Sequence, residues 1–571
     1  MKSFLRLVII FCGAAFLFSS CNKKNDEGKM IPKNAMFVVQ LNTKSLREKL
    51  SWDDIKQTNW YKQAYTDGSA KGWMKKLLDN PENSGIDLDG GLVFFAAKNV
   101  GTDGEMVLEG LVKDESNFEQ FNKNLDSTAT LRKDGDLNLL TLKDASVVAW
   151  NDKHFTYVTN PTAAKSKFNS WNDTTENQGN MAPLVDNSIT LSAVCKNLFS
   201  LKSDSSLEKN EKFTDLLKEK GDVHAWINTE EIMKSSSSLG MLGMLKLDVF
   251  LKDNISTYTV SFENGKINVH QKAYAGKEFS DFLKKYHGEN INADMIKNIP
   301  SENVLGVFAM NFKPEGIKEL IKLTGMDGFL NMYTGQIGFN IDDFVKANKG
   351  DIMLALTDLK IKADSISSKD EQGNSTNPKA YTKPDMNFLF SVSIGDKPSF
   401  QKIVDAGKKL SSEMGNDTSI IYGQNDKLFA VSNHHQFLND YLAAKTNGKS
   451  DFIDKLSSHP IGLYIDIHKI LSLISAQKIS NADDELIMNE SLKLWNNIYM
   501  TGGEFKKNGI EGNTEINFMD QNTNSLKQLN HYFDVIAKVE MAKKEKEKEK
   551  SEINPEDSLI MPPSIDTVGH K

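Results

Sequence analysis

The chain has very little cysteine. Only three cysteines occur among its 571 residues, and two of them, Cys12 and Cys21, lie at the extreme N-terminus. A protein processed after residue 20 would keep Cys21 and Cys195, which excludes a framework of internal disulfides once Cys21 is modified. The apolar neighbours of Cys195 indicate a small buried side chain rather than a nucleophile.

Arginine is equally scarce. Arg6, Arg47 and Arg132 are the only arginines among 69 basic residues, and the others are lysine. Arginine provides the planar, bidentate contacts with which proteins recognise phosphates and bases. The formal net charge is -8, so the chain also lacks the basic excess of nucleic-acid-binding proteins. Both features exclude nucleic acid as a partner.

The sequence also lacks the short motifs of catalysis and metal binding. It contains no His-Glu-x-x-His, no paired Cys-x-x-Cys and no Gly-x-Ser-x-Gly elbow. Asp87-Leu88-Asp89-Gly90 begins like a calcium loop, but the later oxygen ligands are missing. We therefore expect no cofactor, no metal and no catalytic residues, and we favour a non-enzymatic role.

The most informative segment is the N-terminus. Lys2 and Arg6 precede an apolar run over residues 7–18, and Ser19-Ser20-Cys21 follows it. About twelve apolar residues are too few to span a bilayer, which takes roughly twenty. This arrangement is typical of a lipoprotein signal, so we expect cleavage after residue 20 and lipidation of Cys21. An ordinary cleaved signal with an incidental cysteine is the alternative.

Lipidation of Cys21 predicts a protein held at the outer membrane by acyl chains such as palmitate. Loss of residues 1–20 removes Lys2 and Arg6, so the net charge moves from -8 to -10 and gives no attraction to anionic lipid. The acidic pair Asp26-Glu27 resembles short signals that direct some lipoproteins to the cell exterior. We therefore favour the cell surface over the periplasmic face.

Internal similarity divides the mature chain into two parts. Six short patterns recur in the same order, at spacings between 244 and 282 residues. They are Ile31-Pro32 and Ile299-Pro300, Asp114 and Asp396, Asn151 and Asn425, Cys195 and His468, Asn264-Gly265 and Asn508-Gly509, and Leu283 and Leu529. Constant order and similar spacing indicate an internal duplication.

Each part is predicted to be α+β. Apolar runs rich in β-forming residues, such as 36–41 and 304–310, indicate strands, whereas 118–125 and 400–410 have helical spacing. We expect two related mixed sheet-and-helix domains. The expected divisions are a lipoprotein signal peptide at 1–20, a tether at 21–30, repeat domains at 31–295 and 296–535, and a charged helix end with a disordered tail at 536–571.

Four polar residues each follow a predicted strand and precede a predicted helix. They are Asn42, Asn228, Asn311 and Asp466. Their side-chain oxygens can accept the unpaired N–H groups of a first helical turn. We expect them to be helix caps rather than binding residues.

One segment combines aromatic and polar side chains. Trp52, Trp60, Tyr61 and Trp73 are interleaved with carboxylate and amide residues. Aromatic faces beside such groups suit stacking on a sugar or docking of a partner protein. The alternative is that two amphipathic helices bury these aromatics against a sheet. These four residues are the candidate ligand or partner contacts.

The opening over residues 31–39 and the Trp52/Trp60 segment carry a family resemblance. The chain resembles the Bacteroidota lipoproteins grouped as domain of unknown function 4836. The resemblance implies an envelope lipoprotein and assigns no active site. We hypothesise a lipid-anchored binding or scaffolding module of the cell envelope, with an envelope protein or a glycan as partner. The alternative is an envelope hydrolase of glycans or peptides whose carboxylates meet only in the fold.

Overall fold

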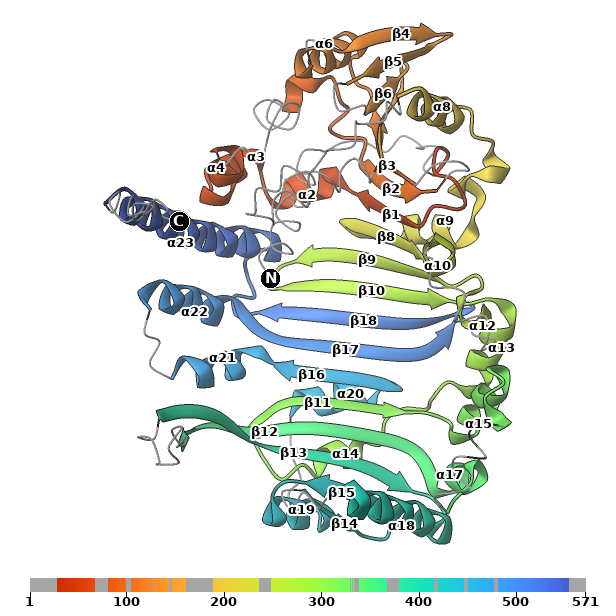
Figure 1. The fold of residues 1–571 in the computed structure, drawn as a ribbon, viewed down its shortest axis with the longest axis vertical. Coiled ribbons are helices and arrows are strands. Elements are labelled where there is room, and N and C mark those ends of the chain that lie inside the picture. Colours follow the sequence, from red (N-terminus) through yellow and green to blue (C-terminus); the bar gives the residue numbers. More distant parts are fainter. Residues whose placement is uncertain are drawn as a thin grey trace, which may run out of the picture.

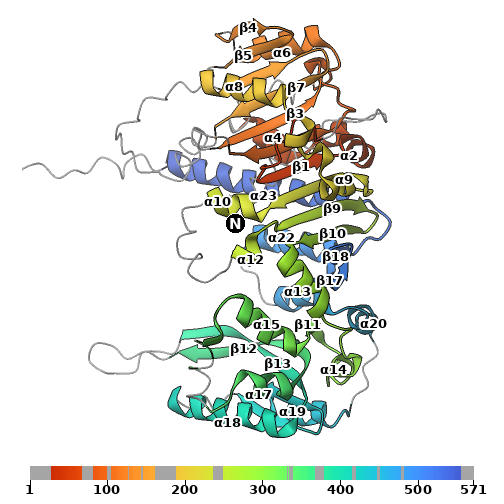
Figure 2. The ribbon, with the colours of Figure 1, turned by 90° about the vertical axis from the view of Figure 1, so that its right-hand side faces the viewer.

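The structure is a computed structural model in which most of the chain beyond the N-terminal segment is described. It describes residues 28–66, 81–98, 104–126, 128–142, 146–160, 188–235, 248–328, 330, 332, 338–366, 379–414, 420–445, 450–476 and 481–553. These residues form a sheet of 18 strands accompanied by helices, which confirms the α+β class. In Figures 1 and 2 the strands stack along the long axis of the molecule.

The first half of the chain contributes one end of the sheet. Its strands are β1 (Phe37–Leu41), β2 (Leu92–Ala97), β3 (Glu105–Leu111), β4 (Thr130–Asp134), β5 (Leu137–Thr141), β6 (Val147–Trp150), β7 (His154–Thr159), β8 (Val223–Asn228), β9 (Ile255–Glu263) and β10 (Lys266–Tyr274). They pair antiparallel in the spatial order β4-β5-β6-β7-β3-β2-β1-β8-β9-β10.

The second half contributes the other end. Its strands are β11 (Val304–Asn311), β12 (Asn348–Ile366), β13 (Lys379–Ile394), β14 (Ile421–Gln424), β15 (Leu428–Ser432), β16 (Ile461–Asp466), β17 (Trp495–Lys506) and β18 (Gly509–Phe518). Their antiparallel order is β14-β15-β13-β12-β11-β16-β17-β18. The strands of the first half follow the same arrangement, with β6-β7-β3-β2-β1-β8-β9-β10 matching β14-β15-β13-β12-β11-β16-β17-β18 one for one. Among the described residues, β4 and β5 of the first half have no counterpart in the second half.

Helices of the first half are mostly short. They are α2 (Thr43–Lys49), α3 (Trp52–Lys56), α4 (Asn59–Thr66), η1 (Pro81–Ser84), α6 (Glu115–Leu125), α8 (Ser188–Phe199), η2 (Ser203–Ser205), η3 (Leu207–Lys209), α9 (Glu211–Lys218), α10 (Thr229–Ser235), α12 (Asp248–Leu251) and α13 (Lys277–Tyr286). One core joins α2–α4 and α6 to the sheet, and a second core joins α8 and α9 to it.

Helices of the second half include the two longest. They are α14 (Ala293–Lys297), α15 (Pro314–Leu323), α17 (Ile341–Ala347), α18 (Lys397–Met414), α19 (His435–Leu442), α20 (Asp451–Ser457), α21 (Ile467–Ser475), α22 (Ala482–Leu494) and α23 (Ser525–Ile553). The core of this half joins α14, α19 and α20 to the sheet. A smaller core lies beneath α17 and α18.

The two halves meet along one strand pair, β10 with β18. Nine consecutive residue pairs join them, from Lys266 opposite Asn517 to Tyr274 opposite Gly509. The Lys272 ammonium lies 3.1 Å from the Glu511 carboxylate across this junction. The backbone hydrogen bonding of the sheet is therefore continuous from one half into the other.

Most of the predicted caps are confirmed. The side chains of Asn42, Asn228 and Asp466 each accept the backbone N–H of the residue three positions later, at 3.2, 3.2 and 2.8 Å. The prediction for Asn311 is wrong, because α15 is preceded by Lys313 instead. The Asn311 amide donates to the Asp351 carboxylate at 2.9 Å and thereby links two strands.

The ends of the predicted divisions fall inside helices. The boundary between residues 295 and 296 lies within α14, where Met295 and Ile296 are both buried in the core of the second half. Residues 536–553 are the last turns of α23, and 554–571 lie outside the described residues. Leu526 and Ala537 of α23 pack into the core of the first half.

Candidate functional site

Three of the four predicted aromatic contacts, Trp52, Trp60 and Tyr61, lie in or against the core under α23. Trp60 is 6% exposed and Tyr61 9%, and the Trp60 indole N–H donates to Asn530 of α23 at 2.9 Å. Trp52 is partly buried, with its ring edge-on to Tyr61 at 5.6 Å between centroids. Figure 1 shows α23 lying beside α4. This burial matches the packing alternative for Trp52, Trp60 and Tyr61.

Two other predicted site residues lie outside the described residues. These are the lipidation candidate Cys21 and the aromatic Trp73. Within the described part of the chain, no helix has the length and apolar character needed to cross a membrane. The same residues contain no cluster of His, Cys, Asp and Glu suited to holding a metal ion.

A pocket opens at the far end of the second half, between α18 and the β14–β15 hairpin. Its volume is about 470 Å³, within the range of roughly 300–1,000 Å³ typical of small-molecule sites. Ile394, at the end of β13, and Phe400 of α18 provide its apolar lining. Phe400 also packs on Phe429 of β15, with 5.5 Å between the ring centroids.

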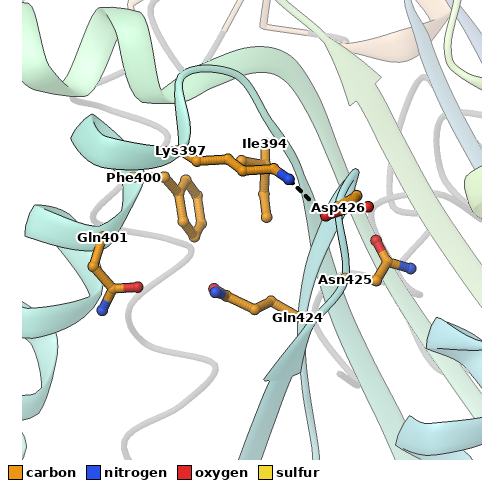
Figure 3. A pocket seen from close by; sticks show the side chains of 7 residues that line it. All are labelled: Ile394, Lys397, Phe400, Gln401, Gln424, Asn425 and Asp426. Atoms are coloured by element: carbon orange, nitrogen blue, oxygen red, sulfur yellow. Dashed lines mark hydrogen bonds and ion pairs between the residues drawn. The ribbon is translucent and has the colours of Figure 1, made fainter.

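Side-chain amides provide much of the polar lining. Gln401 extends from α18, and Gln424 and Asn425 come from the hairpin (Figure 3). Gln401 donates to Asp405 at 2.8 Å, which leaves its carbonyl oxygen as an acceptor. The Asn425 side chain is held within the hairpin, because its oxygen accepts two backbone N–H groups at 2.8 Å. Gln424 is therefore the amide best placed to adapt to a ligand.

An ion pair lies at the rim of the pocket. Lys397 donates to the Asp426 carboxylate at 2.5 Å, and both side chains are exposed (Figure 3). This hydrogen bond, with the charge of Lys397, holds the pKa of Asp426 below its usual value. The two charges offset each other, so the rim presents little net charge to a ligand.

The corresponding place in the first half is filled. Trp150 precedes Asn151 as Gln424 precedes Asn425, and each lies opposite a phenylalanine in the next strand, Phe155 or Phe429. The Trp150 indole is fully buried, with its centroid 5.5 Å from the Phe118 ring of α6. The first half thus holds an indole where the second half has a pocket.

The start of the helix above each site is built in the same way. Asp114 accepts the backbone N–H of the third residue after it at the start of α6, at 2.9 Å. Asp396 does the same before α18, also at 2.9 Å, and additionally accepts the Ser399 hydroxyl. The Ser399 hydroxyl and N–H lower the pKa of Asp396. These caps fix the helices so that Phe118 and Phe400 face their hairpins.

The chemistry of the pocket suits binding. Asp426 is the only carboxylate among the described residues that line it, and it is already paired with Lys397. Glycoside hydrolysis generally needs two carboxyl groups facing the scissile bond, roughly 5–10 Å apart. This pocket therefore gives no support to the hydrolase hypothesis, whereas an aromatic ring with convergent amides suits recognition of a small ligand.

Sequence reasoning did not single out this pocket. The recurrent patterns Asp114/Asp396 and Asn151/Asn425 mark both of its walls, but they were informative only about repetition. A signal for the pocket was available one position before each asparagine, where the first pattern has Trp150 and the second has Gln424. Replacement of a large buried ring by an amide at matched positions indicates a vacated volume.

Comparison with known families agrees with the resemblance. The family model described as "Domain of unknown function (DUF4836)" matches residues 28–526, so the chain belongs to this family. The match covers nearly all of the described sheet and helices. No curated protein was found to match the chain.

One solved structure is similar to part of the chain. It is titled "Structure of crystal form I of TP0453", has 10% sequence identity, and aligns over 48% of this chain and 90% of that chain. The TM-score is 0.23, so the likeness carries no structural argument.

Proposed function

We propose that this chain is a lipid-anchored binding module of the bacterial cell envelope, with the pocket under α18 as its ligand site. The observation that carries the binding role is the amide-lined pocket with an aromatic wall at Phe400. The envelope assignment rests on the signal-like N-terminus and on Cys21. A Bacteroidota lipoprotein displayed at the outer surface of the outer membrane is the specific form of the proposal.

We also propose that the two halves arose by internal duplication. Support comes from the matching strand order of the halves and from the recurrence of Asn151 and Asn425 at equivalent hairpin turns. In both turns the asparagine oxygen accepts the N–H groups two and three residues later. A duplicated scaffold allows one copy to keep a filled core while the other carries a site.

The binding role is tested with the mature protein and an extract of envelope glycans and peptides. We expect a ligand that is retained through washing and recovered chemically unchanged by mass spectrometry. Recovery of cleaved products, absent when the protein is omitted, would instead support the hydrolase alternative. Failure to retain any component would contradict a binding role.

The anchor is tested by Cys21→Ala. We expect the variant to move from the membrane fraction to the soluble fraction, because acyl chains are its proposed attachment. Cell fractionation with immunoblotting measures this, and Cys195→Ala serves as the matched control because Cys195 is buried in the fold. Unchanged membrane association of the Cys21→Ala variant would refute the anchor.

A further inference from the structure

We infer that the pocket under α18 binds an uncharged sugar ring. In the second half this ring would take the place that the Trp150 indole fills at the matched position of the first half. This inference rests on the proposed binding function and names the ligand class of the same site. It follows from three properties of the pocket: its size, the character of its wall, and the pairing of its polar groups.

The size follows from the matched positions. Trp150 and Phe155 face each other across one hairpin, and Gln424 and Phe429 across the other. In the first half the space between hairpin and helix is occupied by one indole, which is in contact with Phe118. With Gln424 at the matched position of the second half, room remains for a ligand of similar dimensions, such as one pyranose ring.

The wall of the pocket is apolar on one side. Phe400 and Ile394 line it with the small parts of their side chains that stay exposed, 6% and 3%, and Phe400 is held in place by Phe429. Tyr422 lies 5.9 Å from Phe429 in a stacked orientation and continues the aromatic surface along β14. An aromatic surface accepts the C–H face of a sugar ring, as it does other apolar faces.

The pocket is also lined by amide groups that match hydroxyls, from α18 beside Phe400 and from the hairpin (Figure 3). An amide offers both donors and an acceptor, and a hydroxyl likewise donates and accepts. Gln424 supplies a whole amide, and Gln401 supplies its carbonyl oxygen because its nitrogen donates to Asp405. A purely apolar ring would strip water from these amides without replacing the hydrogen bonds, which is costly.

Charge favours a neutral ligand. Lys397 and Asp426 are the only charged residues among the described residues that line the pocket, and they pair with each other. A phosphate or carboxylate ligand would have to compete with Asp426 for Lys397. An uncharged polyol leaves this ion pair intact.

The test uses the mature protein, purified in detergent, and a panel of methyl pyranosides observed by saturation-transfer NMR. Gln424→Trp restores the indole of the first half and should reduce affinity for the bound glycoside at least tenfold. Because the new ring fills a cavity, the melting temperature should stay the same or rise. Gln436→Trp, at an exposed position of α19 outside the pocket, is the control and should bind as the parent does.

A second variant covers the case in which Gln424→Trp does not fold. Gln424→Ala keeps the pocket open but removes the amide, and we expect about a tenfold loss of affinity, the size of one hydrogen bond to a ligand. Equal affinity of both Gln424 variants and the parent would overturn the assignment of the site. The pocket under α18 would then be ruled out as the ligand site, and only binding of the glycoside to the protein would remain.

Further outcomes distinguish failure of the sugar inference from failure of the proposed binding function. N-acetyltryptophanamide is included as a probe for an aromatic peptide side chain. If it binds in a Gln424-dependent manner while no glycoside does, the sugar inference is wrong and the binding module stands. If neither probe nor any component of an envelope extract binds, both the inference and the proposed function are overturned.

Discussion

Glu109 of β3 is a carboxylic acid placed where almost no water reaches it. It is 8% exposed and lies directly opposite Thr156 of β7. Burial raises its pKa from 4.5 to about 8, because a charge is poorly solvated there. The folded protein therefore holds a proton on Glu109 at pH values where the unfolded chain has released it.

This difference predicts a fall in stability as pH rises. Below pH 4.5 Glu109 is protonated in both the folded and the unfolded protein. Between about pH 4.5 and 8 it is protonated only in the folded protein. The free energy of unfolding should fall across that window by on the order of 4 kcal/mol and level off above it. Glu109→Gln should largely remove this slope in urea denaturation at pH 5, 6.5 and 8.

The control for this prediction is Glu119→Gln. Glu119 is a carboxylate of α6 that lies close to Lys123 near the protein surface. Its replacement should leave the slope of stability with pH as in the parent. A parent protein whose stability does not fall between pH 5 and 8 would contradict the buried-acid account.

Single residues were predictable where burial follows from a local pattern. The sequence indicates a buried Cys195, and burial is observed and raises the thiol pKa to about 12. Trp60 and Tyr61 permitted two interpretations because a local sequence does not show what covers a helix. Their cover is α23, which begins 464 residues beyond Tyr61.

Helix α23 is the element with the most distant partners. It contacts α4, α22 and β9, and its Asp534 carboxylate accepts the backbone N–H of Asn59. Leu526 and Ala537 are buried within the core that contains Trp60. Beyond this region Lys543 and Lys546 lie near acidic residues of α22 at 3.2 and 3.9 Å. The first turns of α23 are thus core, and its end is a charged surface.

Truncation distinguishes these two parts. Ending the chain after residue 542 removes the ion pairs of Lys543 and Lys546 with α22 and should change the melting temperature by no more than about 1 °C, because exposed ion pairs contribute little. Ending it at residue 524 uncovers Trp60 and should cost at least about 3 kcal/mol or abolish folding. Circular dichroism melts of both truncated proteins measure this, and equal stability of the two would contradict the role of α23.

Elements were predicted well where the pattern is local. Three of the four predicted caps were confirmed, and each required only neighbouring residues. The β12–β13 hairpin extends further than its apolar runs indicated, with pairing continuing to Ile366 and Lys379. Polar residues follow the apolar runs in this part of the sequence, and alternation of apolar side chains cannot reveal a strand made of them.

The whole molecule is organised around the β10–β18 junction. This pairing joins residues that lie 235 to 251 positions apart in the sequence, through nine residue pairs. The sequence of neither strand predicts which strand it pairs with, because edge strands pair through backbone N–H and C=O groups that are common to nearly all residues. The continuation of one sheet across this junction was therefore not predictable from the sequence.

The junction predicts that the second half is not soluble alone. Residues 288–553 expressed without the first half would expose the β18 edge and the face of α23 that packs on α4. Such an edge invites pairing between copies, so we expect the fragment to form larger oligomers or aggregates than the full chain does. Size-exclusion chromatography with light scattering measures this. A monomeric fragment with a cooperative melting transition would show that the halves are independent.

The reach of α23 back to α4 also bears on how the chain is made. A ribosome completes α2–α4 early, but the residues that close the core around Trp60 are made more than 450 positions later. At roughly 5–20 residues per second, the interval is on the order of tens of seconds. Throughout that time the first half presents an open apolar surface. We therefore expect the chain to bind holding chaperones until α23 has been made, which crosslinking of chains stalled before residue 525 would measure.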